Sequence, residues 1–232
     1  MSLLEEQERR KARRKLSALY PDTGPLRREL YPKHMAFFAA GVEHMERCMM
    51  AANRVGKTWG VGGYETALHL TGRYPEWWPG RRFDRPVQVW VAGDTRTTTR
   101  DIIQHALCGV GAEGKSEMLG TGLIPGDDII GEPTSMPGVP GAFDSVIVRH
   151  TSGGRSICQF KSYDQGRKTF QGTKKDLIWL DEEPEIAVYE EAMLRLTATD
   201  AGADNGLMLC TFTPLLGLSR VALKFLPELA PQ

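Results

Sequence analysis

Residues 51–58 read Ala-Ala-Asn-Arg-Val-Gly-Lys-Thr and follow an apolar run of strand length. They match the Walker A pattern, GxxxxGK[ST], at every position except the first glycine, where this chain has Ala51. In that pattern the backbone N–H groups of the turn point at phosphate oxygens, and Gly56 lets the backbone approach closely. Lys57 would bind the β- and γ-phosphates, and the hydroxyl of Thr58 would ligate Mg²⁺. The predicted nucleotide-binding residues of this segment are Ala52, Asn53, Arg54, Val55, Gly56, Lys57 and Thr58.

A second segment, residues 176–184, reads Asp-Leu-Ile-Trp-Leu-Asp-Glu-Glu-Pro. Four apolar residues followed by Asp-Glu form the Walker B pattern of ATPases that place a glutamate beside the aspartate that organises Mg²⁺. Asp181 would hold Mg²⁺ through its water shell, and Glu182 would polarise the attacking water as the general base. A buried strand that ends in a solvated acidic turn would give the same pattern. The Walker A segment upstream makes the catalytic interpretation the stronger one, with ATP as substrate.

The segment Tyr31-Pro32-Lys33-His34 lies just ahead of the strand that leads into the Walker A turn. In many P-loop motors an element at this place holds the adenine, with an aromatic or proline surface and a polar side chain that reads the base edge. Tyr31, Pro32 and His34 would take those parts. The segment is also typical of a helix start that packs the following aromatic side chains into the core, and the two interpretations are compatible.

Residues 207–214, Leu-Met-Leu-Cys-Thr-Phe-Thr-Pro, are typical of a buried strand that ends in hydroxyl residues. A polar residue at the tip of the strand beside Walker B commonly contacts the γ-phosphate and reports its presence. Thr211 or Thr213 is the candidate for this coupling role.

The other elements, which must position these segments, have recognisable signatures. Two β-rich runs joined by Thr-Ser-Gly-Gly predict a hairpin, and Gly93-Asp94-Thr95 predicts a helix cap. A long excursion rich in glycine, proline and small polar residues, 109–141, is of a kind that tends to be functional. The expected strands are 87–92, 145–149 and 156–161, and the expected helices are 2–19, 59–71, 97–107, 185–198 and a short amphipathic segment over 218–227.

Composition and charge limit the class of protein. The chain of 232 residues suits one large domain or a domain with appendages, and 41% hydrophobic with 25% charged residues is ordinary for a globular protein. The net charge is zero, so any contact with nucleic acid must be local. No apolar run is long enough for a membrane span, and the N-terminus is charged, so we expect an intracellular, soluble protein. The four cysteines show no metal-binding spacing and are expected to be free thiols.

The N-terminal residues 2–19 combine strong helix formers with an acidic start and a basic continuation. A solvated helix is the favoured interpretation, and a basic arm that contacts phosphates or a neighbouring subunit is the alternative. A turn at 21–25 separates this arm from the body. The expected organisation is an arm over 1–30, an ATPase core over 31–217, and the start of a lid or linker over 218–232.

The order of these segments resembles the ATPase portion of the large terminase subunit of tailed bacteriophages, the motor that packages DNA into a procapsid. The resemblance covers about residues 31–217, and its most specific parts are the Walker A segment, Arg-Tyr-Pro-Glu-Trp-Trp-Pro-Gly, Leu-Ile-Trp-Leu-Asp-Glu-Glu-Pro and Thr-Phe-Thr-Pro. It implies an α/β P-loop NTPase of the additional-strand catalytic-glutamate class, with a mainly parallel central sheet flanked by helices, that uses ATP and Mg²⁺.

The resemblance also implies partners: double-stranded DNA, the portal protein and the small terminase subunit. The chain would be a monomer in dilute solution in the host cytoplasm and a homo-oligomeric ring while assembled at the procapsid portal vertex. Full-length members carry a C-terminal nuclease, and this chain is expected to be the motor half alone.

Two departures from the family pattern concern site residues. The family's adenine motif usually carries glutamine where this chain has His34, and its subunit-bridging arginine precedes Walker B, where this chain has Gln171-Gly172. The nearest candidate for that arginine is Arg167, with Arg155 or Arg149 further back. In related motors an arginine within the P-loop acts in cis on the γ-phosphate, and here that residue would be Arg54.

Other classes of protein share these motifs. A helicase-like translocase or a nucleotide kinase would also have both Walker segments, but neither a second recombinase-like domain nor an arginine-rich lid is evident. A nucleotide-dependent assembly switch that binds ATP without turnover is the non-enzyme alternative. Glu182 argues against it, because a switch needs no carboxylate to activate water.

Overall fold

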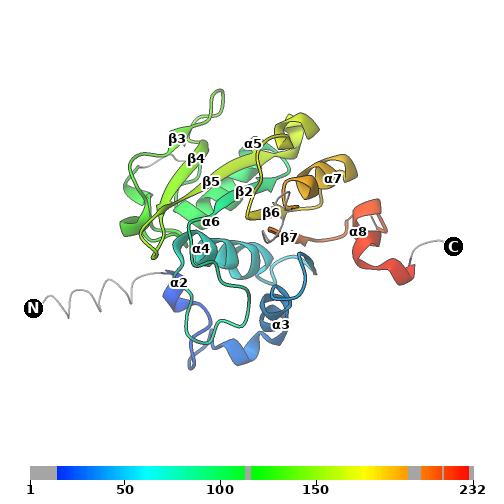
Figure 1. The fold of residues 1–232 in the computed structure, drawn as a ribbon, viewed down its shortest axis with the longest axis horizontal. Helices are drawn as coiled ribbons and strands as arrows, with labels where there is room; N and C mark the ends of the chain where they lie inside the picture. The colour runs from blue at the N-terminus through cyan, green and yellow to red at the C-terminus, as the bar shows by residue number, and fades with distance from the viewer. Residues whose placement is uncertain (1–14, 113–115, 198–204, 216, 230–232) are drawn as a thin grey trace, which may run out of the picture.

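The computed structural model describes residues 15–112, 116–197, 205–215 and 217–229. A seven-stranded sheet runs through it in the order β1-β7-β6-β2-β5-β4-β3 (Figure 1). The strands β1, β7, β6, β2 and β5 run parallel to one another, and β4 pairs antiparallel with β5 on one side and with β3 on the other. The prediction of a mainly parallel sheet is therefore confirmed. The strand bounds are β1 Glu46–Met50, β2 Gln88–Gly93, β3 Thr134–Ser135, β4 Phe143–Arg149, β5 Arg155–Ser162, β6 Leu177–Asp181 and β7 Leu207–Phe212.

Helical elements cover both faces of the sheet. Successive residues of β6 illustrate the two layers: Trp179 packs in the cluster that contains α3 and α4, and Leu180 packs in the cluster that contains α7 and α8. All five residues of β6 are buried, as expected for a parallel strand with both faces covered. The helices are α2 Lys15–Ala18, α3 Pro32–Ala40, α4 Tyr64–Thr71, α5 Arg96–Thr98, α6 His105–Cys108, α7 Ile186–Leu194 and α8 Arg220–Phe225; the π-helices are η2 Lys57–Gly63 and η3 Thr99–Gln104; the 3₁₀ turns are η1 Arg28–Leu30, η4 Ser116–Met118, η5 Gly126–Asp128, η6 Tyr163–Gln165, η7 Arg167–Phe170 and η8 Pro227–Leu229.

The position of β7 decides how the two Walker segments meet. It lies between β1, which leads into the P-loop, and β6, which carries Walker B. Thr211 pairs with Met49 of β1 on one side and with Asp181 of β6 on the other. Because parallel strands present their carboxyl ends at one edge of the sheet, the P-loop and Asp181 lie at the same edge. This inserted strand is the additional strand of the predicted class.

The helix after the P-loop begins earlier than the sequence predicted, and its first part is a π-helix. We expected a helix over 59–71, whereas helical structure starts at Lys57 with the π-helix η2 and continues as α4 to Thr71. Glycines line this first part because large side chains lie against it. A Cβ atom at Gly62 would stand 2.1 Å from the indole of Trp179. Hydrophobic spacing could not predict this π-helix, since Trp179, which packs against it, lies more than a hundred positions further along the chain.

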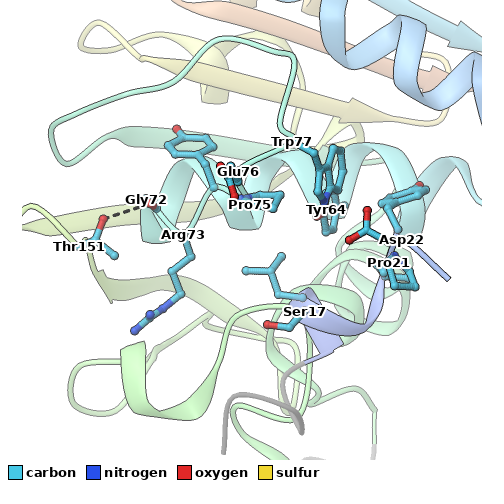
Figure 2. A pocket seen from close by; sticks show the side chains of 14 residues that line it. Ser17, Pro21, Asp22, Tyr64, Gly72, Arg73, Pro75, Glu76, Trp77 and Thr151 are labelled. Carbon is cyan, nitrogen blue, oxygen red and sulfur yellow. Dashed lines mark hydrogen bonds between the residues drawn. The ribbon is translucent and has the colours of Figure 1, made fainter. Parts of the chain in front are cut away.

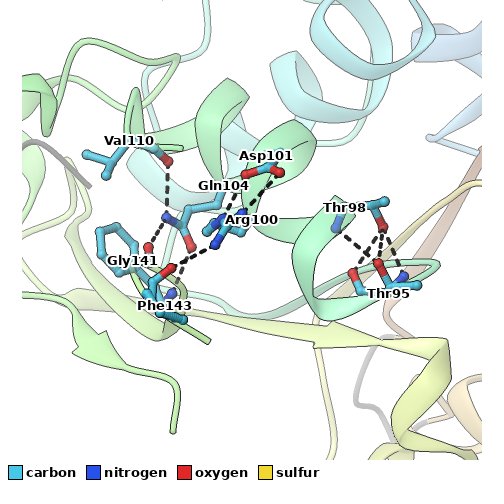
Figure 3. Close-up of polar contacts among 9 residues, drawn as sticks. Thr95, Thr98, Arg100, Asp101, Gln104, Val110, Gly141 and Phe143 are labelled. Atoms are coloured by element: carbon cyan, nitrogen blue, oxygen red, sulfur yellow. Dashed lines mark hydrogen bonds and ion pairs between the residues drawn. The ribbon is translucent and has the colours of Figure 1, made fainter. Parts of the chain in front are cut away.

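The long loop over 109–141 is closed at its base by one side chain. The amide nitrogen of Gln104 donates to the carbonyls of Val110 (3.0 Å) and Gly141 (2.9 Å), and its oxygen accepts from the N–H of Phe143 (2.7 Å) (Figure 3). In the same figure Thr95 caps the start of α5, as the sequence predicted. The helix expected over 97–107 is present but runs through α5, η3 and α6.

Most of the expected N-terminal helix lies outside the described residues. Its last part, α2, is described, and Leu16 and Tyr20 are buried in the main core cluster. Trp78 is also buried there, and its indole nitrogen donates to the carbonyl of Arg81 (3.0 Å). The adjacent Trp77 packs against the same cluster, so the two tryptophans anchor their loop onto the core.

The cysteines agree with the prediction of free thiols. All four thiols are free: three are buried, and Cys48 is half-buried. No helix in the described part of the chain combines the length and apolar character needed to cross a bilayer.

Candidate functional site

The P-loop encloses a small cavity at the carboxyl edge of the sheet. Arg54 and Gly56 both have left-handed backbone conformations, with φ of 63° and 87°. Such turns direct successive backbone N–H groups toward one point, which favours an anion. The cavity has a volume of about 210 Å³. Its lining residues are Asn53, Arg54, Gly56, Lys57, Thr58, Trp59 and Glu182.

Lys57 is buried and ties the P-loop to β7. Its ammonium donates to the carbonyls of Ala51 (2.9 Å) and Ala52 (2.7 Å) and to the hydroxyl of Thr213 (2.9 Å). The Thr213 hydroxyl also lies 2.9 Å from the carbonyl of Ala51 and 2.9 Å from the side-chain oxygen of Asn53. Thr213 thus contacts both the P-loop backbone and its lysine, which is the arrangement a coupling residue needs.

Thr58 and Asp181 form a pair of oxygen donors. The Thr58 hydroxyl lies 3.2 and 3.1 Å from the two carboxylate oxygens of Asp181. Burial raises the pKa of Asp181 to about 6, partly offset by the hydroxyls of Thr211 and Thr58. A cation here would relieve that desolvation, and a hydroxyl with a carboxylate suits Mg²⁺, which keeps several of its own waters. The donor set therefore fits the metal that the sequence predicted.

Thr211 supports Asp181 from the strand beside it. Its hydroxyl donates to Asp181 Oδ1 (2.6 Å) and accepts from the indole N–H of Trp179 (2.7 Å). The two candidates for coupling therefore have different contacts: Thr211 orients the Walker B carboxylate, and Thr213 contacts the P-loop.

Replacing Thr211 with valine should destabilise the fold by about 1–3 kcal/mol, because the isosteric side chain leaves the Trp179 N–H without its partner and removes the 2.6 Å bond to Asp181 Oδ1. Thr66→Val is the matched control. Thr66 is equally buried, and its hydroxyl has no hydrogen-bond partner among the described residues, so losing that hydroxyl should cost little or stabilise. Urea unfolding of both variants measures the difference; equal losses would mean that the Thr211 bonds contribute nothing.

Glu182 occupies a strained position at the mouth of the cavity. Its φ is 68°, and the hydroxyl of Tyr163 lies 3.0 Å from its carbonyl and 3.1 Å from that of Asp181. Partial desolvation raises the pKa of Glu182, with Lys57 opposing the rise and Asp94 adding to it. Backbone strain of this kind is typical of functional residues and persists only where the surroundings hold it.

Sequence reasoning missed Tyr163 and Asp94. Asp94 follows β2, the strand next to β6, so an acidic residue after a central strand was a usable signal. Tyr163 follows β5 in the turn η6, and no local pattern relates it to Glu182.

Comparison with known proteins shows the family of this chain. The family described as "Terminase large subunit, T4likevirus-type, N-terminal" matches residues 48–231. The chain belongs to this terminase family. The large terminase subunit of Salmonella phage P22 is 39% identical over 213 residues, which make up 84% of this chain and 41% of that protein. This terminase chain thus spans less than half the length of that curated relative.

Solved terminases share the fold. The large terminase of the thermophilic bacteriophage D6E has a TM-score of 0.53 at 11% identity, covering 85% of this chain and 42% of that one. The same protein in complex with ADP has a TM-score of 0.51 at 12% identity, covering 85% and 41%. At these identities the similarity concerns the fold alone, a P-loop ATPase domain of the additional-strand class.

The adenine candidates of this terminase chain lie beside the P-loop. His34 is buried, and its Nδ1 lies 2.7 Å from the hydroxyl of Tyr20. Tyr31 stacks on the His34 ring with centroids 5.3 Å apart. The adenine contact itself stays a prediction.

The arginine candidates lie at opposite edges of the sheet. Arg167, in η7 after β5, is 60% exposed, and its Nε donates to Glu191 of α7 (2.8 Å). Arg155 begins β5 and pairs with Arg149 in the hairpin. Since β5 is parallel to β2, those two arginines lie at the amino edge, roughly 23 Å along the strand from its carboxyl end.

Proposed function

We propose that this chain hydrolyses ATP as the motor domain of a large terminase subunit and thereby powers translocation of double-stranded viral DNA into a procapsid. The observation that carries the proposal is the cavity at the sheet edge that Lys57, Thr58 and Glu182 line. Thr213 bonds to this lysine, and Asp181 bonds to this threonine. Membership of the terminase family and the ADP complex of the related D6E protein support it.

The residues of the cavity divide the work of hydrolysis. The P-loop N–H groups and Lys57 bind the phosphates, and Arg54 stabilises charge on the γ-phosphate in cis. Thr58 and Asp181 would hold Mg²⁺, which supplies positive charge to the phosphates when bound. Glu182 orients a water and accepts its proton. Thr213 loses or keeps its bond to Lys57 according to whether the γ-phosphate is present, and so passes nucleotide state to β7.

The partners of the motor follow from the same assignment. These partners are double-stranded DNA, the portal protein and the small terminase subunit. The motor would bind them in the host cytoplasm and at the portal vertex. The isolated chain would be a monomer with weak ATPase activity, and a homo-oligomeric ring would form on the procapsid.

The test is the ATPase rate of the purified chain, alone, with double-stranded DNA, and with DNA plus portal-bearing procapsids. A DNA-packaging motor should hydrolyse slowly alone and faster in the assembly. ATP binding without turnover under every condition would instead support an assembly switch. Stimulation by single-stranded nucleic acid alone would support a helicase-like translocase.

Binding to DNA should depend steeply on salt, because the chain has no net charge and must bind phosphates locally. We expect log affinity to fall by about 0.9 for each phosphate contact per decade of salt. Arg81 and Arg82 are candidates, since bonds to loop carbonyls and contacts with Phe83 and Tyr74 hold their guanidinium groups in place. Arg81→Ala/Arg82→Ala should lower the slope in a fluorescence anisotropy titration; salt-independent affinity would contradict electrostatic DNA binding.

Arg167 should act in trans on the nucleotide of a neighbouring subunit. A supplied arginine of this kind can contribute about 10³–10⁵ in rate. Arg167→Ala subunits mixed with wild type should therefore depress ATPase activity and packaging by assembled motors. Glu191 keeps Arg195 as a second partner (3.3 Å), so the fold should tolerate the change.

Arg155→Ala is the matched comparison for the mixing experiment. It removes an exposed arginine from the far edge of the sheet and should leave assembled-state hydrolysis unchanged. If Arg155→Ala abolishes activity while Arg167→Ala does not, the hairpin supplies the trans-acting arginine. If neither variant matters, the trans-acting residue is neither Arg167 nor Arg155.

A further inference from the structure

Tyr20 lies under the P-loop although it belongs to the N-terminal segment. It is 3% exposed and has a left-handed backbone, with φ of 57°. A cavity of about 730 Å³ lies between this segment and residues 72–77 (Figure 2). The side chain of Tyr20 packs against rings from several separate elements: those of Tyr31, His34, Phe38, Tyr64 and Trp77.

The hydroxyl of Tyr20 joins two groups that flank the nucleotide site. It lies 2.7 Å from the carbonyl of Gly60 and 2.7 Å from Nδ1 of His34. A carbonyl can only accept, so the Tyr20 O–H donates to Gly60 and its oxygen accepts from Nδ1–H of His34. Burial raises the pKa of Tyr20, which keeps the phenol protonated as this donor.

The turn that Tyr20 contacts is the one that carries the phosphate-binding residues. Gly60 lies in η2, which begins at Lys57, and the N–H of Gly60 bonds to the carbonyl of Gly56 (2.7 Å). His34 lies against the start of the same turn: a Cβ atom at Gly56 would stand 3.3 Å from the His34 ring. The bridge from Tyr20 therefore reaches both ends of the first turn after the P-loop.

We propose that Tyr20 is a positioning residue for the nucleotide site, holding the first turn of η2 so that the phosphate-binding groups of the P-loop are already in place before the ligand arrives. The proposal rests on the proposed function for its ligand, but the hold on the turn is a property of the chain alone. Tyr20 lies outside residues 48–231, the part that the family match covers. The nucleotide site of this chain thus extends into a segment that neither Walker motif predicts.

The first experiment compares Tyr20→Phe with Tyr74→Phe by amide hydrogen exchange without nucleotide. Each change removes one hydroxyl with two hydrogen bonds: that of Tyr74 bonds His69 (2.8 Å) and the N–H of Phe83 (2.9 Å), away from the P-loop. Tyr20→Phe should speed exchange of the Gly60 and Val61 amides at least about five-fold, and Tyr74→Phe should not. Unchanged protection in Tyr20→Phe would overturn the proposal.

The second experiment measures the affinity of both variants for a fluorescent ADP analogue. Tyr20→Phe should bind about five-fold more weakly, which corresponds to about 1 kcal/mol, and Tyr74→Phe should bind as wild type even if it melts at a lower temperature. Faster exchange with unchanged affinity would show that Tyr20 is only structural and would overturn the proposal. If wild type binds no nucleotide, the proposed function fails, while the exchange comparison still decides whether Tyr20 holds the turn.

A double-mutant cycle with Gly60→Ala tests the contact directly. A Cβ at position 60 would stand 2.7 Å from the Tyr20 hydroxyl, and the next nearest atom, in His34, is 3.5 Å away. Removing the hydroxyl therefore makes room for the methyl group. Gly60→Ala should be less harmful to stability in the Tyr20→Phe background than in wild type; strictly additive effects would contradict the geometry.

Discussion

Lys57→Ala is expected to abolish nucleotide binding or turnover, with a loss of at least ~10²–10³-fold, the scale for removing one positioned donor from developing phosphate charge. In the proposed function the ammonium would be the main counter-ion for the β- and γ-phosphates. In this structure it also makes three bonds, to Ala51, Ala52 and Thr213, so its removal deletes one of the links between the P-loop and the end of β7. Isothermal titration with ATP and a steady-state ATPase assay measure the two losses.

Lys224→Ala is a suitable control because Lys224 is an exposed lysine of α8 that takes no part in the site. It should leave both measurements near wild type. Hydrolysis at the wild-type rate by Lys57→Ala would contradict the Walker A assignment itself.

Glu182→Gln should keep ATP binding and lower hydrolysis by at least ~10²-fold, the usual scale for a positioned base. Glutamine has the size of glutamate but cannot accept the proton of the attacking water. Since the pKa of Glu182 is raised and the base must be ionised, wild-type turnover should fall as the pH drops through that pKa. ATP affinity and single-turnover rates separate binding from chemistry.

Glu183→Gln is the matched control for Glu182. The Glu183 carboxylate accepts a hydrogen bond from Ser219, the N-cap of α8, and does not line the cavity. The Glu183→Gln variant should therefore hydrolyse ATP at a rate within a few-fold of wild type. If Glu182→Gln turns over normally while Glu183→Gln fails, the base role belongs to Glu183.

Local chemistry was readable from the sequence because it depends on neighbouring residues. Gly56-Lys57-Thr58 and Asp181-Glu182 each lie within one short segment, so spacing alone indicated a phosphate and Mg²⁺ site. Alternation and turn residues likewise predicted the strands β2, β4, β5, β6 and β7 to within two residues. Family resemblance added the class of P-loop fold, which the order of strands in the sheet confirms.

Tertiary structure alone decided which side chains serve those segments. The π-helix after the P-loop, the Tyr163 contact with Glu182 and the different contacts of Thr211 and Thr213 all depend on segments that are far apart in the sequence. Tyr20 is a further case, since its partner Gly60 is 40 residues away and its own segment carries no motif. Hydrophobic spacing records which face of an element is buried, but not the side chain that meets it there. A sequence can therefore identify the groups that touch a nucleotide, whereas the groups that hold them are determined by how the sheet brings distant segments together.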